Sequence, residues 1–297
     1  MFIQSSYFFN HRLLTTMKVS RDTITTLSLF FILTIAFYFV GYWLIFRLGK
    51  ATPLMLSVGF AALLTCLIRK RSLTTLGWGW GNWKYAWLSY LIPFALVSIA
   101  YFIIWIFGFG DWYDTAFITE QKNNYNLNQW SDFSIIICHL ILTASISFLM
   151  LLPSVLGEEI AWRGLLVPEL SKFMNFTNVA LVSGFIWSFW HWPLIIKGLY
   201  GNGDTPLVYQ LVIFSVYIMA NAMIITYLRY KTNSVWTAVI YHMSGNVFLQ
   251  KFFTPITIEN PQSHWYMDEF GLVLPLVALV VAIYFWIKGK KEFVNIH

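Results

Sequence analysis

Long apolar runs separated by short polar segments follow one another along the chain. Most runs are about 20 residues long, the length that a helix needs to cross about 30 Å of hydrocarbon. The pattern therefore predicts an all-α, polytopic transmembrane helical bundle with about eight spans. The expected spans are 24–46, 52–68, 86–108, 135–157, 178–196, 207–228, 234–249 and 269–287. The seventh is the shortest, and it contains polar residues.

The spacing of the runs predicts one membrane domain. Only Leu48–Ala51 separates the first two spans, which indicates a tight helical hairpin. No repeat and no Pro- or Ser-rich linker divides the chain. We therefore expect a cytoplasmic N-terminal tail (1–23), a single transmembrane domain (24–287) and a basic cytoplasmic tail (288–297). The first long run exceeds the core of a cleavable signal peptide, and MKVSRD at Met17 resembles a natural start, so residues 1–16 are a candidate upstream extension.

Composition and charge placement support this class. Of the 297 residues, 58% are hydrophobic and 11% charged, whereas soluble domains carry about a quarter charged residues. With a cytoplasmic N-terminus, 14 of the 19 lysines and arginines fall on the inside, as the positive-inside rule requires. These are Arg12, Lys18, Arg21, Arg69, Lys70, Arg71, Lys84, Arg163, Lys172, Arg229, Lys231, Lys288, Lys290 and Lys291. The net charge of +6 thus reports topology and indicates no nucleic-acid partner. We expect a multi-pass integral membrane protein, in the cell membrane if the source is bacterial.

The segment GEEIAWRG, residues 157–164, places three charges after a long apolar run. A charge at a helix centre costs about 2.5–3.5 kcal/mol on the insertion scale, so such residues by default mark functional interiors. In a continuous helix, Glu159 and Arg163 would form an i, i+4 ion pair. Glu158 would then face about 100° away. The alternative is that these charges mark a solvated, cytoplasmic helix end.

Two further segments place polar residues inside spans. FIWSFWHWP contains His191, and YHMSGN places His242 and Asn246 four residues apart on one helix face. The alternatives are a satisfied interior histidine and interhelical hydrogen bonds that hold the bundle together. His139 precedes Glu158 by 19 residues, about 28 Å along a helix, so we expect it at the opposite membrane face.

Together, these segments supply the groups that hydrolysis needs. A carboxylate and a histidine can activate water, and histidine or asparagine donors can stabilise an oxyanion. The two cysteines, Cys66 and Cys138, lie within spans without a CxxC pattern, which favours apolar packing over a disulfide or metal site.

The three segments resemble the motifs of the CPBP (Abi) family of intramembrane proteases, which includes the type II CAAX prenyl endopeptidases. The family pattern is EExxxR, FxxxH and HxxxN, each on a different transmembrane helix. Glu158 to Arg163 match the first motif and His242 to Asn246 match the third. In the second motif, Trp187 stands where the family has phenylalanine, four residues before His191.

The resemblance implies a role for each matched position. Glu158 would act with His191 on the attacking water, and His242 and Asn246 would hold the oxyanion. Glu159 would support the site, paired with Arg163. A glutamate-type mechanism without a cofactor is favoured, since HExxH is absent and asparagine is not a usual zinc ligand. If zinc is present, its ligands would be Glu158, His191 and His242.

The expected function is therefore an intramembrane endopeptidase that acts on a membrane-associated, prenylated or leader peptide. Bacteriocin processing would fit a bacterial source. The site is expected near the cytoplasmic ends of spans four and five, with substrate entering from the inner half of the bilayer or from the cytoplasm. Two alternatives remain: a non-enzymatic scaffold or bacteriocin self-immunity protein of the same family, and a transporter with an acidic intramembrane site. Transporters usually show inverted repeats and helices broken at the midplane, and neither is evident here.

Overall fold

The computed structural model describes residues 19–293 and is almost entirely helical. The predicted all-α bundle is confirmed. Its longer helices are α1 (Arg21–Leu48), α2 (Thr52–Ile68), α3 (Trp83–Ile106), α9 (Phe176–Ile196), α10 (Leu207–Thr232), α11 (Val235–Phe248) and α13 (Val273–Glu292). Shorter helices are α4 (Thr115–Tyr125), α5 (Asp132–Leu142), α6 (Phe148–Met150), α7 (Leu152–Glu159), α8 (Val167–Leu170) and α12 (Ser263–Tyr266). Strands β1 (Asp111–Trp112) and β2 (Thr257–Ile258) pair antiparallel.

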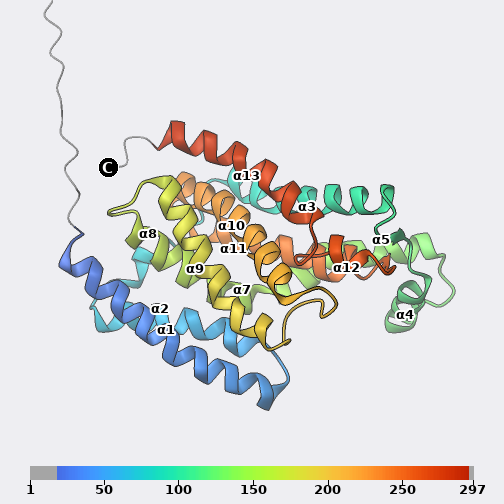
Figure 1. Cartoon of the computed structure of the whole chain (residues 1–297), viewed down its shortest axis with the longest axis horizontal. Helices are drawn as coiled ribbons and strands as arrows, with labels where there is room; N and C mark the ends of the chain where they lie inside the picture. The colour runs from blue at the N-terminus through green and yellow to red at the C-terminus, as the bar shows by residue number, and fades with distance from the viewer. Residues whose placement is uncertain (1–18, 294–297) are drawn as a thin grey trace, which may run out of the picture.

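The long helices run side by side, with α4, α5 and α12 gathered at one end (Figure 1). Helix α1 packs against α2, α10 packs against both α9 and α13, and α11 packs against α3. The predicted α1–α2 hairpin is present. Gly49 ends α1 in the left-handed conformation at φ +63°, and Pro53 lies in the first turn of α2. Both choices suit a tight connection, because glycine tolerates positive φ and proline needs no N–H partner in a first turn.

The count of membrane-spanning helices differs from the expected eight. All eight segments are helical, but six helices in the described residues are long and apolar enough to cross a membrane. Helix α2 has 17 residues and α11 has 14. Ten of the α11 residues are buried, so other helices rather than lipid surround it. The expected tail over 1–23 lies largely outside the described residues, as do positions 294–297 of the basic tail.

The helical path from Asp132 to Leu170 is the element that carries the first motif. It contains two π-helical turns, Thr143–Ser147 and Ile160–Leu166, a feature often found at functional sites. The expected span ended at residue 157, whereas the path continues helically to Leu170. Glu158 and Glu159 are only 4% and 0% exposed. The alternative in which these charges mark a solvated helix end is therefore wrong.

Two glycines allow α2 and α7 to meet backbone to backbone. A Cβ atom on Gly59 would lie 2.5 Å from the carbonyl oxygen of Gly157. A Cβ on Gly157 would lie 2.9 Å from the Cα of Leu56. Small residues permit such close approach between membrane helices. This contact fixes α7 against α2 directly before Glu158.

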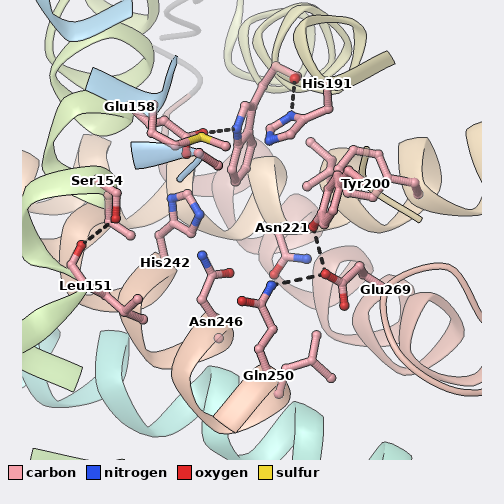
Figure 2. A pocket seen from close by; sticks show the side chains of 18 of the residues that line it. Leu151, Ser154, Glu158, His191, Tyr200, Asn221, His242, Asn246, Gln250 and Glu269 are labelled. Carbon is pink, nitrogen blue, oxygen red and sulfur yellow. Dashed lines mark hydrogen bonds between the residues drawn. The ribbon is translucent and has the colours of Figure 1, made fainter. Parts of the chain in front are cut away.

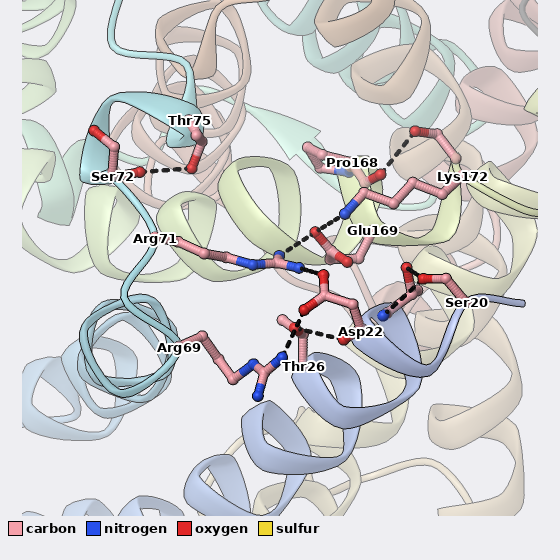
Figure 3. A network of polar contacts seen from close by, with 12 residues as sticks. Ser20, Asp22, Thr26, Arg69, Arg71, Ser72, Thr75, Pro168, Glu169 and Lys172 are labelled. Atoms are coloured by element: carbon pink, nitrogen blue, oxygen red, sulfur yellow. Dashed lines mark hydrogen bonds and ion pairs between the residues drawn. The ribbon is translucent and has the colours of Figure 1, made fainter.

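A network of ion pairs links three elements at the basic end of the bundle (Figure 3). Asp22, in the first turn of α1, accepts from Arg69 at 2.5 Å and also from Arg71, both of which follow α2. Arg71 and Lys172 both donate to Glu169 of α8, at 2.5 Å and 2.6 Å. Glu169 is 5% exposed, so these partners neutralise a buried carboxylate.

Candidate active site

A cavity of about 520 Å³ lies between α2, α7, α9, α10 and α11. Its walls include Glu158 from α7, His191 from α9, and His242 and Asn246 from α11. Figure 2 shows these side chains around a common space. The three sequence motifs therefore meet at one cavity, although they lie up to 88 positions apart in the chain, from residue 158 to residue 246.

Glu158 is held by an indole from the neighbouring helix. Its Oε2 accepts a hydrogen bond from Nε1 of Trp187 at 2.8 Å, and both side chains are buried. Oε1 receives no donor from the described residues. The ring of Trp187 also lies 5.1 Å from that of His242. Tryptophan at the phenylalanine position of the motif thus keeps the aromatic packing and adds an N–H donor to the carboxylate.

Glu159 and Arg163 form the predicted i, i+4 pair. Nη1 of Arg163 donates to both carboxylate oxygens, at 2.9 Å and 3.1 Å, and both side chains are almost completely buried. The guanidinium lies 4.2 Å from the ring centroid of Trp187, in cation–π contact. Neither Glu159 nor Arg163 lines the cavity. Arg163 thus contacts Trp187 and Glu159 without lining the cavity itself.

The hydrogen bond of His191 fixes which ring nitrogen carries the proton. Nδ1 lies 3.0 Å from the carbonyl oxygen of Trp187. Because a carbonyl can only accept, Nδ1 must donate, and the neutral ring then has its lone pair on Nε2. His191 is 6% exposed and lines the cavity. Its Nε2 is therefore a proton acceptor.

His242 and Asn246 follow one another on the cavity face of α11, as Figure 2 shows. Nδ1 of His242 lies 2.9 Å from Oε1 of Glu159. Since this carboxylate is already paired with Arg163, Nδ1 carries the proton and Nε2 remains for a ligand. The amide of Asn246 makes no hydrogen bond within the described residues. Asn246 thus offers an unengaged N–H₂ donor one turn from His242.

Further polar residues line the same cavity, and the sequence alone did not assign them to it. Tyr200, Gln250 and Glu269 share hydrogen bonds at its wall. Glu269 follows the last long polar loop, so its sequence context suggested a solvated acid. Asn221 also lines the cavity, but Tyr217 and Tyr241 satisfy its amide. His139 does not line it; its ring nitrogens bond the hydroxyl of Tyr125 and the carbonyl oxygen of Lys251.

The donor set does not fit a resident metal ion. Within residues 19–293, no group of three or more His, Cys, Asp or Glu side chains is arranged to hold one. Glu158, His191 and His242, the ligands expected for zinc, thus share a cavity without forming such a group.

The cavity reaches the end of the bundle opposite to the one expected. Its lining includes Ala51 between α1 and α2, Tyr200 between α9 and α10, Lys251 after α11, and Glu269 before α13. All four belong to segments that the charge pattern places outside. The expectation of a site near the cytoplasmic ends of spans four and five is wrong for this orientation. The physical reason is that α7 continues past Glu158 and that His191 lies near the far end of α9.

Comparison with known families agrees with the motifs. Residues 139–248 match the family model described as type II CAAX prenyl endopeptidase Rce1-like. No curated protein matches the chain. The matched stretch contains all three motifs and the helices α7, α9 and α11 that carry them. Its apolar helices make the chain an integral membrane protein. Over residues 139–248, the chain is therefore similar to the Rce1-like type II CAAX prenyl endopeptidases, in agreement with the resemblance that its three motifs indicate.

Proposed function

We propose that the chain is an intramembrane endopeptidase that hydrolyses a peptide bond of a membrane-associated peptide, such as a prenylated tail or a leader peptide. The bundle over residues 24–287 forms its single catalytic domain. The observation that carries this proposal is the convergence of Glu158, His191, His242 and Asn246 on one cavity of about 520 Å³. A cavity of this size accommodates a short extended segment of peptide.

In this proposal, Glu158 and His191 activate the attacking water. Oε1 of Glu158 and Nε2 of His191 are both acceptors, because the other oxygen and the other nitrogen are engaged by Trp187. A water held between them loses a proton to Oε1 of Glu158 as its oxygen attacks the scissile carbonyl carbon. Glu158 then returns that proton to the leaving nitrogen as the C–N bond breaks.

In the same proposal, His242 and Asn246 stabilise the oxyanion. Nδ1 of His242 is committed to Glu159, so donation from Nε2 requires the doubly protonated ring. The buried Glu159 carboxylate lies next to this doubly protonated, positively charged ring of His242. The Asn246 amide adds a neutral donor from the next turn. Loss of one oxyanion donor typically costs about 10²–10³ in kcat.

The test is cleavage of a peptide library by protein purified in detergent. We expect Glu158→Gln, His191→Ala and His242→Ala each to reduce turnover at least about 100-fold while the protein stays folded. Matched controls are Glu120→Gln, on the exposed surface of α4, and His264→Ala, in the short helix α12. Wild-type turnover in any of the three site variants would reject the assignment. Parallel loss of folding and activity would favour the scaffold alternative.

A further inference from the structure

A buried carboxylate in the cavity wall takes no part in the proposed catalytic steps. Glu269 precedes α13 and is 6% exposed. Its Oε1 accepts from the hydroxyl of Tyr200 at 2.7 Å and from Nε2 of Gln250 at 3.1 Å (Figure 2). No donor from residues 19–293 reaches Oε2. One carboxylate oxygen is thus held in place while the other remains available in the cavity.

No cation of the described chain neutralises this carboxylate. Glu269 takes part in no ion pair within residues 19–293, in contrast to buried Glu159 and Glu169. Lys251 lines the same cavity, yet its ammonium forms no ion pair with it either. A buried charge without a partner is costly, and buried charges are normally paired. The cavity therefore lacks a positive group beside Glu269.

Tyr200 keeps the carboxylate oriented and near the catalytic groups. Burial raises the pKa of the Tyr200 hydroxyl well above its ordinary value, and the Glu269 carboxylate raises it further. The hydroxyl therefore stays protonated and can only serve Glu269 as a donor. The ring of Tyr200 lies 5.9 Å from that of His191. Through Tyr200, Glu269 is thus linked to the side of the cavity that His191 lines.

We propose that Glu269 is the specificity-determining residue of a subsite for a cationic group of the substrate peptide. A lysine or arginine side chain near the cleaved bond and a free N-terminal amine offer the same chemistry. This inference rests on the proposed function. Tyr200 and Gln250 are its positioning residues, and a bound ammonium or guanidinium would supply the missing countercharge.

The test compares matched peptides that carry arginine, citrulline, norleucine or a free or acetylated N-terminus. We expect Glu269→Gln to raise KM for the arginine peptide about 10- to 100-fold, as for the loss of a hydrogen bond to a charged group. Cleavage of the citrulline peptide should hardly change. Glu259→Gln is the matched control, an exposed acid in the preceding loop. If acetylating the N-terminus abolishes the effect of Glu269→Gln on KM, and replacing arginine by citrulline does not, the N-terminal amine is the ligand.

Binding separates this inference from the proposed chemistry. Affinities of the same peptides for Glu158→Gln protein are measured with and without Glu269→Gln. Loss of the arginine or amine preference supports the subsite even if no peptide is cleaved. Equal binding of charged and neutral peptides to the Glu158→Gln protein overturns it. An equal fall in kcat for all peptides also overturns it, since Glu269 would then act only through Tyr200.

A second observation concerns the side of the membrane on which the cavity opens. The loops that contribute to its lining are those at Ala51, Tyr200, Lys251 and Glu269, all at one end of the bundle. None of the connections at the other end contributes: residues 69–82, 171–175 and 233–234 are absent from the lining. The cavity is therefore closed toward that second end.

The two ends differ in charge. The closed end carries most of the lysines and arginines of the described chain, among them Arg69, Lys70, Arg71 and Lys84. The open end carries most of the acids: Asp111, Asp114, Glu120, Asp132, Asp204, Glu259, Asp268 and Glu269. By the positive-inside rule, the closed end faces the cytoplasm. We infer that the cavity opens on the extracytoplasmic side, so that a translocation step must deliver the peptide before it is bound.

The test is labelling of single cysteines in intact cells, in a chain with Cys66→Ser and Cys138→Ser. Asn124→Cys, on α4, should react with a membrane-impermeant maleimide. Thr75→Cys should react only after the cells are permeabilised. Both exposed substitutions leave the charge pattern unchanged, and labelling in detergent shows that each thiol is reactive. The reverse pattern overturns the inference and leaves the peptidase proposal untouched.

Discussion

Replacing Trp187 by phenylalanine restores the family's motif residue and removes a single hydrogen-bond donor. The bond from Nε1 of Trp187 to Glu158 is 2.8 Å long, and the two side chains are 2% and 4% exposed. A hydrogen bond to a charged group contributes about 1.5–3 kcal/mol in soluble proteins. In membrane bundles, measured interhelical bonds average about 0.6 and reach about 1.7 kcal/mol. We therefore expect a coupling of about 1–2 kcal/mol between Trp187 and Glu158.

A double-mutant cycle isolates this bond from the loss of ring size. Unfolding free energies are measured by SDS titration in mixed micelles for wild type, Trp187→Phe, Glu158→Ala and the double variant. The smaller ring affects both backgrounds equally, so it cancels in the coupling. Trp190→Phe is the matched control, because the buried Nε1 of Trp190 has no hydrogen-bond partner among the described residues. Its coupling to Glu158→Ala should be close to zero.

The same substitution tests the role of Trp187 in the reaction. If Trp187 positions Glu158, Trp187→Phe should lower kcat about 5- to 30-fold, the equivalent of about 1–2 kcal/mol. KM should change little, since the ring surface remains. A coupling below about 0.5 kcal/mol, together with unchanged kcat, would refute the reasoning that the indole N–H holds the carboxylate.

Three further predictions concern stability. Gly59→Ala should lower the free energy of unfolding by about 1–3 kcal/mol, because the new Cβ would overlap the α7 backbone; Gly79→Ala, with open space around it, should be neutral by the same SDS titration. Arg163→Met should cost about 3–5 kcal/mol by leaving a buried charge unpaired, and adding Glu159→Gln should recover part of that loss; no recovery would contradict the ion-pair argument. Burial raises the pKa of Asp268, and the adjacent carboxylate raises it further, so the fold loses stability as the pH rises from the ordinary pKa of the unfolded chain to the raised pKa of the folded chain. Asp268→Asn should therefore raise the thermal midpoint at pH 7, with the gain shrinking as the pH falls and vanishing below the ordinary pKa of an aspartate; an equal gain at low pH would point to another cause.

The sequence predicted local features of the site well. The i, i+4 spacing predicted the Glu159–Arg163 pair, and the HxxxN spacing predicted that His242 and Asn246 share a helix face. Both follow from the 3.6-residue period of a single helix. The hairpin between the first two spans was predicted from their short separation, Leu48–Ala51. In the structure, Gly49 and Pro53 form this connection.

The number of spans was less predictable from local pattern. Hydropathy treats each apolar run as if lipid surrounded it, but α11 is enclosed by other helices and needs neither full length nor an apolar surface. The end of the fourth span was also misplaced. A charged triplet resembles a helix end in sequence, and only buried partners such as Trp187 allow the helix to continue through it.

The sequence by itself therefore determined the all-helical membrane class, the helix faces that carry polar groups, and the family that the central stretch resembles. These three features depend on the periodicity and the residue types of consecutive positions in the sequence. Tertiary structure alone decided that Trp187 holds Glu158, that Glu159 bonds His242, and that Glu269 faces the same cavity. Each of these contacts joins residues that are distant in the sequence. The helical period fixes the relative directions of side chains only within one helix. Packing, through contacts such as Gly59 against Gly157, sets which of those directions meet.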